Sequence, residues 1–532
     1  MTKIVKTLLF AILFSVLILG KPAHAQTINA ATCSQADVLA ALKSVTVDGT
    51  TVRIPAGTCH WTTGLSYSAT HSVSIIGAGS QSVVGGGDVT NIVDDVQHNV
   101  NGASDSTLSF GTTLGKTFRF SGITIISGTA TTSNGGVFTL GGSSQAFRVD
   151  HCHFSGLFQA QLTVRGQQYG VFDHNLFEIA NTGVVAAAGG WGGYPNGDGS
   201  FADDSTLGSN RYIYYENNTF TGGNQLNDCY QGGRNVFRFN TVNNNSLQTH
   251  PVGHDSSTGN DRGCRATEIY RNTFNGNPNC ATNFNMCKFN IFFLSAGTAL
   301  VWGNNAPAMN SQAGSGWQWL ITLHSMRRNN NTYTQTATPN GWGYCGAAFT
   351  GTGSGWDQNA NSTMGYACLD DPGRGKSDLL IGNHPNKKNS TTGTIAWPHQ
   401  ALEPVYEWLD TFNKVANNPG GLVLSQSDVL TQNVDYYMYQ TSGCVGTQTT
   451  GVCSGTLANR ATSCTKGVGY WATDQGNWNQ SGSGGQGELY VCTAANTWSL
   501  YYTPYTYPHP LVSGSGSSNN VAAPTNLAAT VQ

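Results

Sequence analysis

Hydrophobic and polar residues alternate over short stretches of this chain, and glycine, serine or asparagine bounds each stretch. Residues 73–76 (VSII) and 118–120 (FRF) are examples. A period of two that ends in turn residues predicts short strands. Residues 34–44 are an exception, because their alanine, valine and leucine fall on one helical face. We therefore expect a mainly β protein with one helix near its start.

A six-residue segment recurs through the middle of the chain. Its copies are 149–154 (VDHCHF), 172–177 (FDHNLF), 215–220 (YENNTF), 237–242 (FRFNTV) and 269–274 (IYRNTF). Their last residues lie 23, 43, 22 and 32 positions apart, which fits a period of about 22 with insertions. A fixed period of this size predicts a solenoid whose coils stack and bury their apolar sides against one another.

The repeat also predicts which side chains point inward. We expect the first and last residue of each copy to face the core, because both positions are apolar in every copy. Four asparagines share one register: Asn175, Asn218, Asn240 and Asn272. A row of inward asparagines at a turn can bond the backbone of neighbouring coils, so that buried polar groups are satisfied.

The chain divides into five parts. Residues 1–25 have a basic start, an apolar run and a small-x-small site, which predicts a cleaved signal peptide and a secreted protein. We expect an N-terminal cap at 26–61, the solenoid at 62–430, a Cys- and Tyr-rich region at 431–511 and a flexible tail at 512–532. Two insertions break the period, at 181–210 and 246–265, and insertions in a solenoid often gather on its binding face.

Composition narrows the possible partners. Only 10% of the residues are charged and the net charge is −3, so no basic excess favours nucleic acid or a membrane surface. No segment after the first 25 residues is apolar enough to span a bilayer. We expect a monomer whose partner is a cell-wall or matrix polysaccharide.

Thirteen cysteines in an exported chain predict disulfides. Neighbours in sequence suggest 33/59, 280/287, 345/368, 444/453 and 464/492, with 229/264 closing the second insertion. Cys152 is then left over, at the position that asparagine holds in the other four copies. A zinc site is the alternative, but the chain has no CxxC pair.

The repeats, the asparagine row and several phrases together resemble the parallel β-helix proteins of the pectate lyase-like superfamily. The phrases are VRIPAGTCHW, FRVDHCHF, VFDHNLFEI, YYENNTF, CRATEIYRNTF, ALEPVYEW and YTPYTYPHPL. The resemblance covers roughly residues 30–510 and implies an all-β, right-handed parallel β-helix. It implies less about activity, because that superfamily includes lyases, hydrolases, epimerases and adhesins.

The densest group of charged side chains lies in and beside the second insertion. Elimination on a uronate needs a base, an acid for the leaving oxygen, and a cation that stabilises the developing charge. We expect His254 to serve as base or acid, with Arg262 and Arg265 binding the substrate carboxylate. The full catalytic set is His254, Arg262, Arg265, Asp255 and His250, and Asp228 joins the substrate site. The alternative is structural, with Arg265 paired to Glu268 and Asp255 capping a turn.

Three acids of the repeat share one outward register: Asp150, Asp173 and Glu216. Stacked coils place such neighbours about 4.8 Å apart, so the carboxylates repel unless a cation intervenes. One interpretation is a Ca²⁺ site. The other is a hydrated row relieved by Arg148, Arg211 or Arg238. His151 and His174 stack in the next register and are more typical of structural than of catalytic histidines.

The first insertion offers a different chemistry. Trp191 and Tyr194 could stack on a sugar, and the acids Asp198, Asp203 and Asp204 follow them. Paired carboxylates beside aromatic rings suit a glycoside hydrolase, whereas loop acids are more often simply solvated. The sequence thus favours a secreted polysaccharide lyase, with a hydrolase on the same scaffold or a non-catalytic structural or adhesion protein as alternatives.

Overall fold

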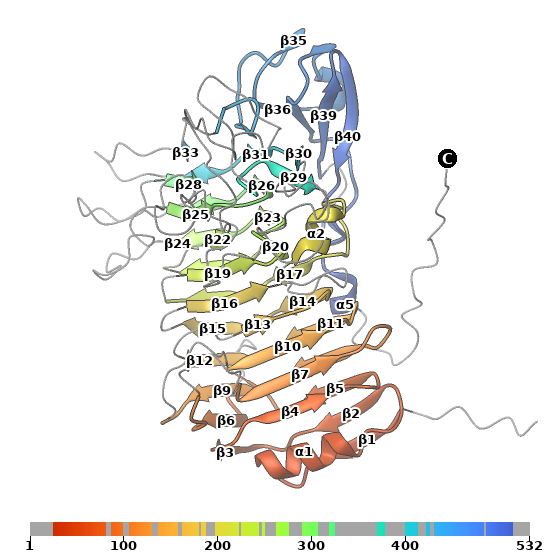
Figure 1. The fold of residues 1–532 in the computed structure, drawn as a ribbon, viewed down its shortest axis with the longest axis vertical. Helices are drawn as coiled ribbons and strands as arrows, with labels where there is room; N and C mark the ends of the chain where they lie inside the picture. Colours follow the sequence, from red (N-terminus) through yellow and green to blue (C-terminus); the bar gives the residue numbers. More distant parts are fainter. Residues whose placement is uncertain are drawn as a thin grey trace, which may run out of the picture.

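Each sequence repeat forms one coil of a parallel β-helix, and the coils stack into a rod (Figure 1). The computed structural model describes residues 25–80, 87–98, 106–129, 137–157, 162–179, 182–187, 197–222, 225–243, 247–249, 262–275, 290–306, 319–324, 370–377, 400–412, 422–425, 430–482 and 486–513. Within these residues the fold is nearly all-β, as the sequence predicted.

Three parallel sheets, here called A, B and C, line the rod. Sheet A contains β1 (Thr27–Asn29), β2 (Thr50–Arg53), β5 (Val73–Ile76), β8 (Phe118–Ser121), β11 (Phe147–Asp150), β14 (Gly170–Asp173), β17 (Ile213–Glu216), β20 (Arg234–Arg238), β23 (Ala266–Tyr270), β26 (Thr298–Trp302), β31 (Val405–Trp408) and β34 (Tyr436–Tyr437). Sheet B contains β3 (Gly57–Trp61), β6 (Thr90–Asp94), β9 (Thr124–Ser127), β12 (His153–Leu157), β15 (Leu176–Ile179), β18 (Thr219–Thr221), β21 (Thr241–Asn243), β24 (Thr273–Asn275), β27 (Asn305–Ala306) and β32 (Thr411–Phe412). Sheet C contains β4 (Leu65–Ser68), β7 (Leu108–Thr112), β10 (Phe138–Gly142), β13 (Leu162–Val164), β16 (Thr182–Ala187), β19 (Gln225–Tyr230), β22 (Leu247–Thr249), β25 (Asn290–Leu294), β28 (Trp319–Leu323) and β33 (Val423–Ser425).

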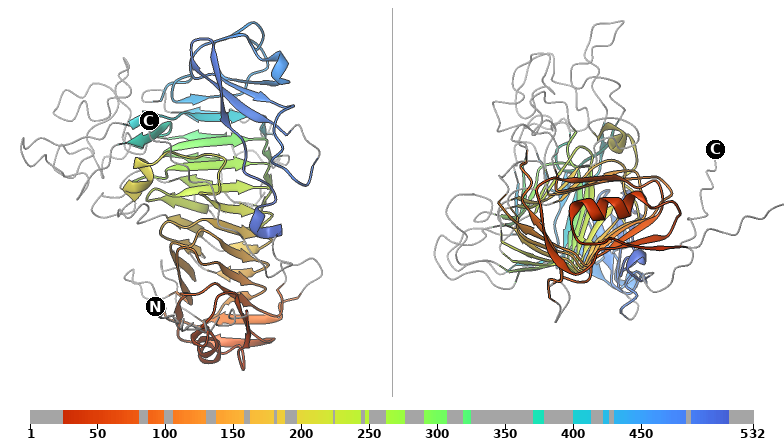
Figure 2. Two further views of the ribbon diagram at one scale, coloured as in Figure 1. Left: turned by 90° about the vertical axis from the view of Figure 1, so that its right-hand side faces the viewer. Right: turned by 90° about the horizontal axis from the view of Figure 1, so that it is seen from below.

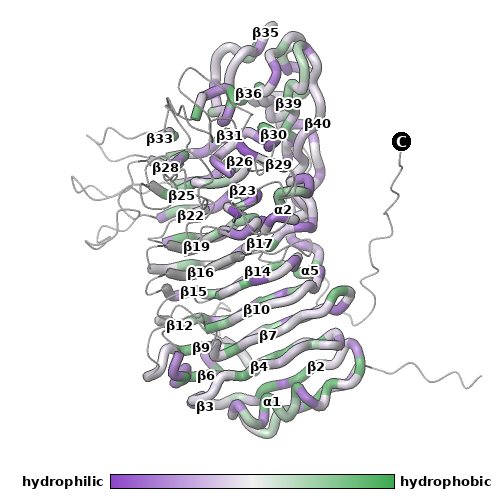
Figure 3. Tube along the Cα trace, in the orientation of Figure 1, coloured by the Kyte–Doolittle hydropathy of each residue, from purple (hydrophilic) through white to green (hydrophobic). Residues whose placement is uncertain are grey.

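The core is built from stacked copies of the same repeat position. The first and last residues of all five copies are buried, which confirms their inward placement. Phe172 stacks on Tyr215 with ring centroids 5.0 Å apart, and Phe154 stacks on Phe177 at 4.9 Å. These distances match the spacing of adjacent strands. Figure 3 shows hydrophobic residues recurring from coil to coil along the rod.

The asparagine row runs inside the corner between sheets A and B. The side chain of Asn240 donates to the carbonyl of Tyr215 at 2.8 Å and to Oδ1 of Asn272 at 2.9 Å, and its own Oδ1 accepts from the backbone of Asn218 at 2.9 Å. The row continues to Asn304 and ends at Asp410, whose Oδ1 accepts from Asn304. At its other end Cys152 replaces asparagine and is a buried free thiol. The row therefore satisfies the corner backbone of consecutive coils.

A helix covers the N-terminal end of the rod, as expected. Helix α1 (Gln35–Lys43) begins at Ser34, whose side chain accepts from the backbone of Asp37 at 3.3 Å. Its apolar face, with Val38 and Leu42, packs on the first coil. Figure 2 shows the helix lying across the open end of the coils. The disulfide Cys33–Cys59 ties this cap to β3.

The insertions begin later than the sequence suggested. Residues 182–187 form β16 and residues 247–249 form β22, so both belong to sheet C. The first insertion carries helix α2 (Asp198–Ala202), and β29 (Arg374–Ser377) pairs with β30 (Gln400–Leu402) in a third insertion. Strands also occur in the expected cap, because β1, β2 and β3 join sheets A and B. The coil pattern thus extends beyond residues 62–430 at both ends.

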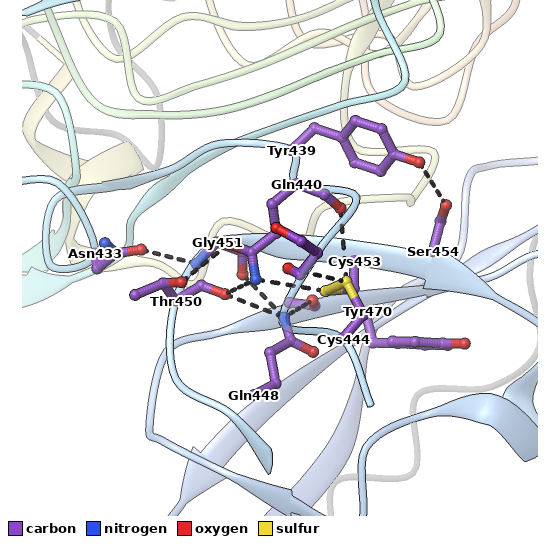
Figure 4. The surroundings of a disulfide bond; sticks show 12 residues. Asn433, Tyr439, Gln440, Cys444, Gln448, Thr450, Gly451, Cys453, Ser454 and Tyr470 are labelled. Atoms are coloured by element: carbon purple, nitrogen blue, oxygen red, sulfur yellow. Dashed lines mark hydrogen bonds between the residues drawn. A yellow bond between two sulfur atoms is a disulfide. The ribbon is translucent and has the colours of Figure 1, made fainter. Parts of the chain in front are cut away.

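The C-terminal region forms a separate antiparallel and parallel sheet on top of the rod. It contains β36 (Val452–Gly455), β38 (Gly469–Ala472), β39 (Glu488–Ala494) and β40 (Thr497–Tyr502), beside the pair β35 (Thr447–Gln448) and β37 (Ser463–Cys464) and the short 3₁₀ helix η3 (Leu457–Asn459). Disulfides Cys444–Cys453 (Figure 4) and Cys464–Cys492 hold it, as predicted. Cys229–Cys264 is also confirmed. The pairs 280/287 and 345/368 lie outside the described residues.

After β40 the chain turns back along the outer face of sheet A. Residues 503–513, here called the return segment, end in helix α5 (Pro510–Ser513) beside β14 (Figure 1). His509 donates its backbone N–H to Glu216 at 2.9 Å, and Arg148 donates to the carbonyl of Leu511 at 3.3 Å. The return segment therefore covers a face of the solenoid that the repeat alone would leave in solvent. No helix among the described residues is long and apolar enough to cross a membrane.

Candidate functional site

Three insertions leave the rod at the same edge, where sheet C passes to sheet A. They connect β16 to β17, β22 to β23, and β28 to β31. The described parts of the first and third insertions meet there, because α2 packs against β29. Insertions on one edge of a solenoid are where such folds place binding and catalytic residues. This edge, here called the insertion edge, is our candidate functional site.

Arg262 joins all three insertions. Its guanidinium donates to both carboxylate oxygens of Asp370, at 2.8 and 2.7 Å, and to Oδ1 of Asp198 at 2.6 Å. Its side chain and that of Asp370 are 0% exposed. A bidentate arginine–carboxylate pair fixes both position and orientation. Arg262 thereby holds the second insertion to α2 on one side and to the strand pair β29–β30 on the other.

Arg265, three positions after Arg262, also forms a bidentate pair with a carboxylate. It donates to both oxygens of Glu403, at 2.8 and 3.0 Å, and to the carbonyl of Ser200 at 3.2 Å. The ring of Phe201 lies 4.2 Å from the guanidinium carbon of Arg262 and 5.5 Å from that of Arg265. Helix α2 is therefore fixed between two arginines by charge, hydrogen bonds and stacking. The pairing of Arg265 with Glu268 that the sequence suggested is wrong.

These contacts correct the role expected for Arg262 and Arg265. Both side chains are 0% exposed, and their guanidiniums already bind protein carboxylates. An arginine that is buried and paired in this way is not accessible to a uronate at the surface. The two residues are positioning residues that support the insertions. Asp198, one of the three candidate hydrolase acids, is likewise paired with Arg262.

Five other predicted site residues fall outside the described residues: His250, His254, Asp255, Trp191 and Tyr194. Their places in the chain are nevertheless informative. The first three follow Thr249 at the end of β22 and precede Arg262, and the two aromatics lie between β16 and α2. Both stretches start and end at the insertion edge. Asp228 lies in β19, its Cα in register with Val185 and Gln248 of sheet C.

The acid row forms buried ion pairs, which corrects the calcium interpretation. Asp150 is paired with Arg119, Asp173 with Arg148, and Glu216 with Arg238, at 2.6–2.8 Å. Hydrogen bonds from Arg119 and His151 hold the pKa of Asp150 well below its usual range, although burial alone would raise it. Guanidiniums occupy the oxygens that Ca²⁺ would need, so the row does not fit a calcium site. Arg211, another expected partner of the row, pairs with Asp203 instead.

His151 and His174 lie at the corner between sheets A and B. Each ring is hydrogen-bonded through Nδ1 to the aspartate that precedes it, and the two rings stack with centroids 5.2 Å apart. The hydrogen bond to Asp173 raises the pKa of His174. Both residues have positive φ, which Asn217, Phe239, Arg271 and Leu409 share at the same corner. The conformation is thus a property of the corner and not of a catalytic histidine.

Glu268 is a buried acid beneath the C-terminal region, and it gives the stability of the fold a pH dependence. It accepts from the backbone of Gly208 and from the hydroxyl of Tyr502, each at 2.7 Å, and burial raises its pKa to about 7. The folded state therefore holds the proton more tightly than the unfolded state. That contribution to stability is full at acid pH and is lost as the pH rises from about 4.5 to about 7.

We expect the substitution Glu268→Gln to remove this loss. Near pH 8 the free energy of unfolding of the variant should exceed that of the parent by about 2 kcal/mol, so that the variant unfolds at a higher urea concentration. Near pH 5 the two proteins should unfold at similar urea concentrations. Urea titrations at the two pH values measure the difference. An equal effect at both pH values would contradict the assignment to Glu268.

Sequence reasoning missed the partners that organise the insertion edge. Asp370 stands beside Asp371, Pro372 and Gly373, a combination typical of a turn, and Glu403 stands in the phrase ALEPVYEW. Asp370 is 108 positions from Arg262, and Glu403 is 138 positions from Arg265. No spacing rule connects residues so far apart in different insertions. The only signal was the rarity of charge in this chain, which makes each buried carboxylate a candidate partner for an arginine.

Comparisons with known proteins find only distant likenesses. No protein-family model and no curated protein sequence matches the chain. The alginate lyase from Paenibacillus sp. str. FPU-7 is 14% identical with a TM-score of 0.28, over 56% of this chain and 99% of that chain. The catalytic domain of a GH87 alpha-1,3-glucanase in complex with tetrasaccharides is 10% identical with a TM-score of 0.33, over 80% and 69%. These likenesses are too distant to decide a reaction, which has to be argued from this chain's own residues.

Proposed function

We propose that the chain is an exported, polysaccharide-active enzyme and that it cleaves uronate-containing glycans by β-elimination. The observation that supports this best is the insertion edge, where Arg262 and Arg265 fix three insertions to one another through buried ion pairs. A rigid support of this kind is what a precisely positioned site on loops requires. A structural rod does not require precisely positioned insertions at one edge.

The proposed chemistry rests on the residues between β22 and Arg262. We assign His254 as the group that removes the proton next to the uronate carboxylate, with His250 and Asp255 as candidates for the acid that assists the leaving oxygen. Since Arg262 and Arg265 bind protein carboxylates, the positive charge that faces the uronate has to come from another residue. Trp191 and Tyr194 remain our candidates for stacking on the sugar.

Turnover on defined polysaccharides tests the proposal. Protein starting at Gln26 would be incubated with polygalacturonate, alginate and neutral glucans, with and without a chelator. Ultraviolet absorbance reports an unsaturated uronate, and new chain ends report any cleavage. We expect absorbance from at least one acidic glycan, and a loss of about 100-fold or more in His254→Ala.

His60→Ala is the matched control, because His60 is an exposed histidine on β3, near the α1 end of the rod. It should keep parental turnover. New chain ends without absorbance would identify a hydrolase and overturn the elimination. Parental activity in His254→Ala would overturn the assignment of the base. Absence of cleavage on all glycans would favour the structural or adhesion alternative.

A further inference from the structure

A second site lies on the opposite edge of sheet A, at the corner with sheet B. A partly open pocket of about 360 Å³ lies there between the rod and the C-terminal region. The rod contributes the corner residues Phe239, Arg271 and Leu409, and the C-terminal region contributes Trp471 and Trp478 among others. Strand β23 separates Arg265, at the insertion edge, from Arg271, so the two sites are distinct.

Arg271 differs from five arginines that lie on sheet A or at its edges. Arg119, Arg148, Arg238, Arg262 and Arg265 all bind carboxylates. Arg271 is exposed, and no carboxylate among the described residues pairs with it. Its guanidinium lies 5.5 Å from the ring of Trp302. Partial burial lowers its pKa, and no negative neighbour within the described chain opposes that effect.

The walls of the pocket include one partly exposed aromatic ring, that of Phe239, beside side chains that are more deeply buried. Phe239 is half-buried, and the rings of Trp471 and Trp478 are almost wholly buried. The indole N–H of Trp478 has no acceptor within the part of the chain that the structure describes. A buried donor without a partner costs free energy unless a water or a ligand satisfies it. Thr473 adds an exposed hydroxyl.

We propose that this pocket binds a carboxylate-bearing sugar unit. A guanidinium without a partner suits a carboxylate, and aromatic surface beside it suits the apolar face of a pyranose ring. The volume lies within the usual range for small-molecule pockets, about 300–1,000 Å³. The inference stands apart from the proposed catalytic activity, because no residue of the insertion edge lines the pocket. It makes the corner between rod and C-terminal region an anchoring site for an acidic glycan.

Direct binding measurements test the proposal. Digalacturonate, the neutral disaccharide galactobiose and acetate would each be titrated by calorimetry, in the His254→Ala background so that cleavage does not consume the ligand. We expect digalacturonate to bind, and Arg271→Gln to weaken its binding about tenfold or more. Arg53→Gln is the matched control, because Arg53 is an exposed arginine on β2 at the other end of the rod.

The outcomes separate this site from the catalytic one. Equal binding of galactobiose would overturn the role of the carboxylate, and equal binding of acetate would overturn the role of the sugar ring. Unchanged affinity in a folded Arg271→Gln would place the site elsewhere. Trp478→Phe, which keeps a ring but removes the N–H, should weaken binding a few-fold and serves as the second variant. Turnover of the parent protein decides the proposed function independently of all these titrations.

Discussion

Replacement of Arg262 by methionine is expected to lower the free energy of unfolding by about 3–5 kcal/mol. The substitution leaves Asp370 and Asp198 without their cation in a site that is closed to water. Removing one partner of a buried ion pair costs far more than the pair contributes, because the remaining charge stays desolvated. Urea unfolding followed by circular dichroism gives the loss, and turnover on the active glycan should fall with it.

Two further variants identify the cause. Lys376→Met breaks the exposed pair with Asp204 beside the same insertions and should cost less than about 1 kcal/mol. The triple variant Arg262→Met, Asp198→Asn, Asp370→Asn removes the stranded charges and should recover much of the lost stability. A loss below about 1 kcal/mol in Arg262→Met alone would show that the cluster does not support the fold.

The second large effect is expected at Arg238, which holds the return segment. Arg238 donates to Glu216, to the carbonyl of Tyr505 at 2.6 Å and to that of Thr506 at 2.8 Å. Arg238→Met should cost about 3–5 kcal/mol, because Glu216 is left buried and unpaired. It should also free residues 503–513, so that a protease cleaves there at a concentration that leaves the parent intact. Mass spectrometry of the fragments locates the cut.

Arg119→Met is the appropriate comparison for this experiment. Arg119 pairs with Asp150 on the same face of sheet A, but within the described chain no hydrogen bond joins it to the return segment. That variant should lose stability while the return segment stays protected. Equal cleavage in both variants would mean that global stability protects the return segment from the protease, and not the hydrogen bonds that Arg238 donates to it.

The sequence predicted those parts of the fold that repeat locally. The inward positions, the asparagine row, the cap helix and four disulfides all follow from short-range patterns. The copies of the repeat that were missed include 301–306 (VWGNNA) and 407–412 (EWLDTF). The first differs from the other copies by having glycine, Gly303, at the corner position with positive φ. The second has aspartate, Asp410, where the other copies have asparagine. Both differences preserve the corner, because Gly303 readily adopts the positive φ and Asp410 still accepts a hydrogen bond from Asn304.

The site was harder to predict, because its contacts are not local. The sequence correctly predicted that Asp150, Asp173 and Glu216 share one register on the outer face. It also predicted that this row is exposed, which is wrong because all three side chains are buried. The return segment comes from nearly 300 positions away, as in the contact of His509 with Glu216, and covers that row. Arg262 was likewise recognised as important but given the wrong partner. A periodic sequence pattern predicts which residues of successive coils stack in one row. It does not predict which distant segment of the chain covers that row.

The return segment also determines where the chain leaves the rod. Because α5 lies beside β14, Ser513 is level with the middle coils and not with the tip that carries β35 (Figure 1). A reporter or a second protein fused after Ser513 would therefore be tethered to the flank of the rod, whereas one inserted near Gly446 would mark its far end. Two such labels would report how the rod is oriented on a surface or in a matrix. The attachment point after Ser513 depends on Arg148 and Arg238, which bind the return segment, and not on the number of coils.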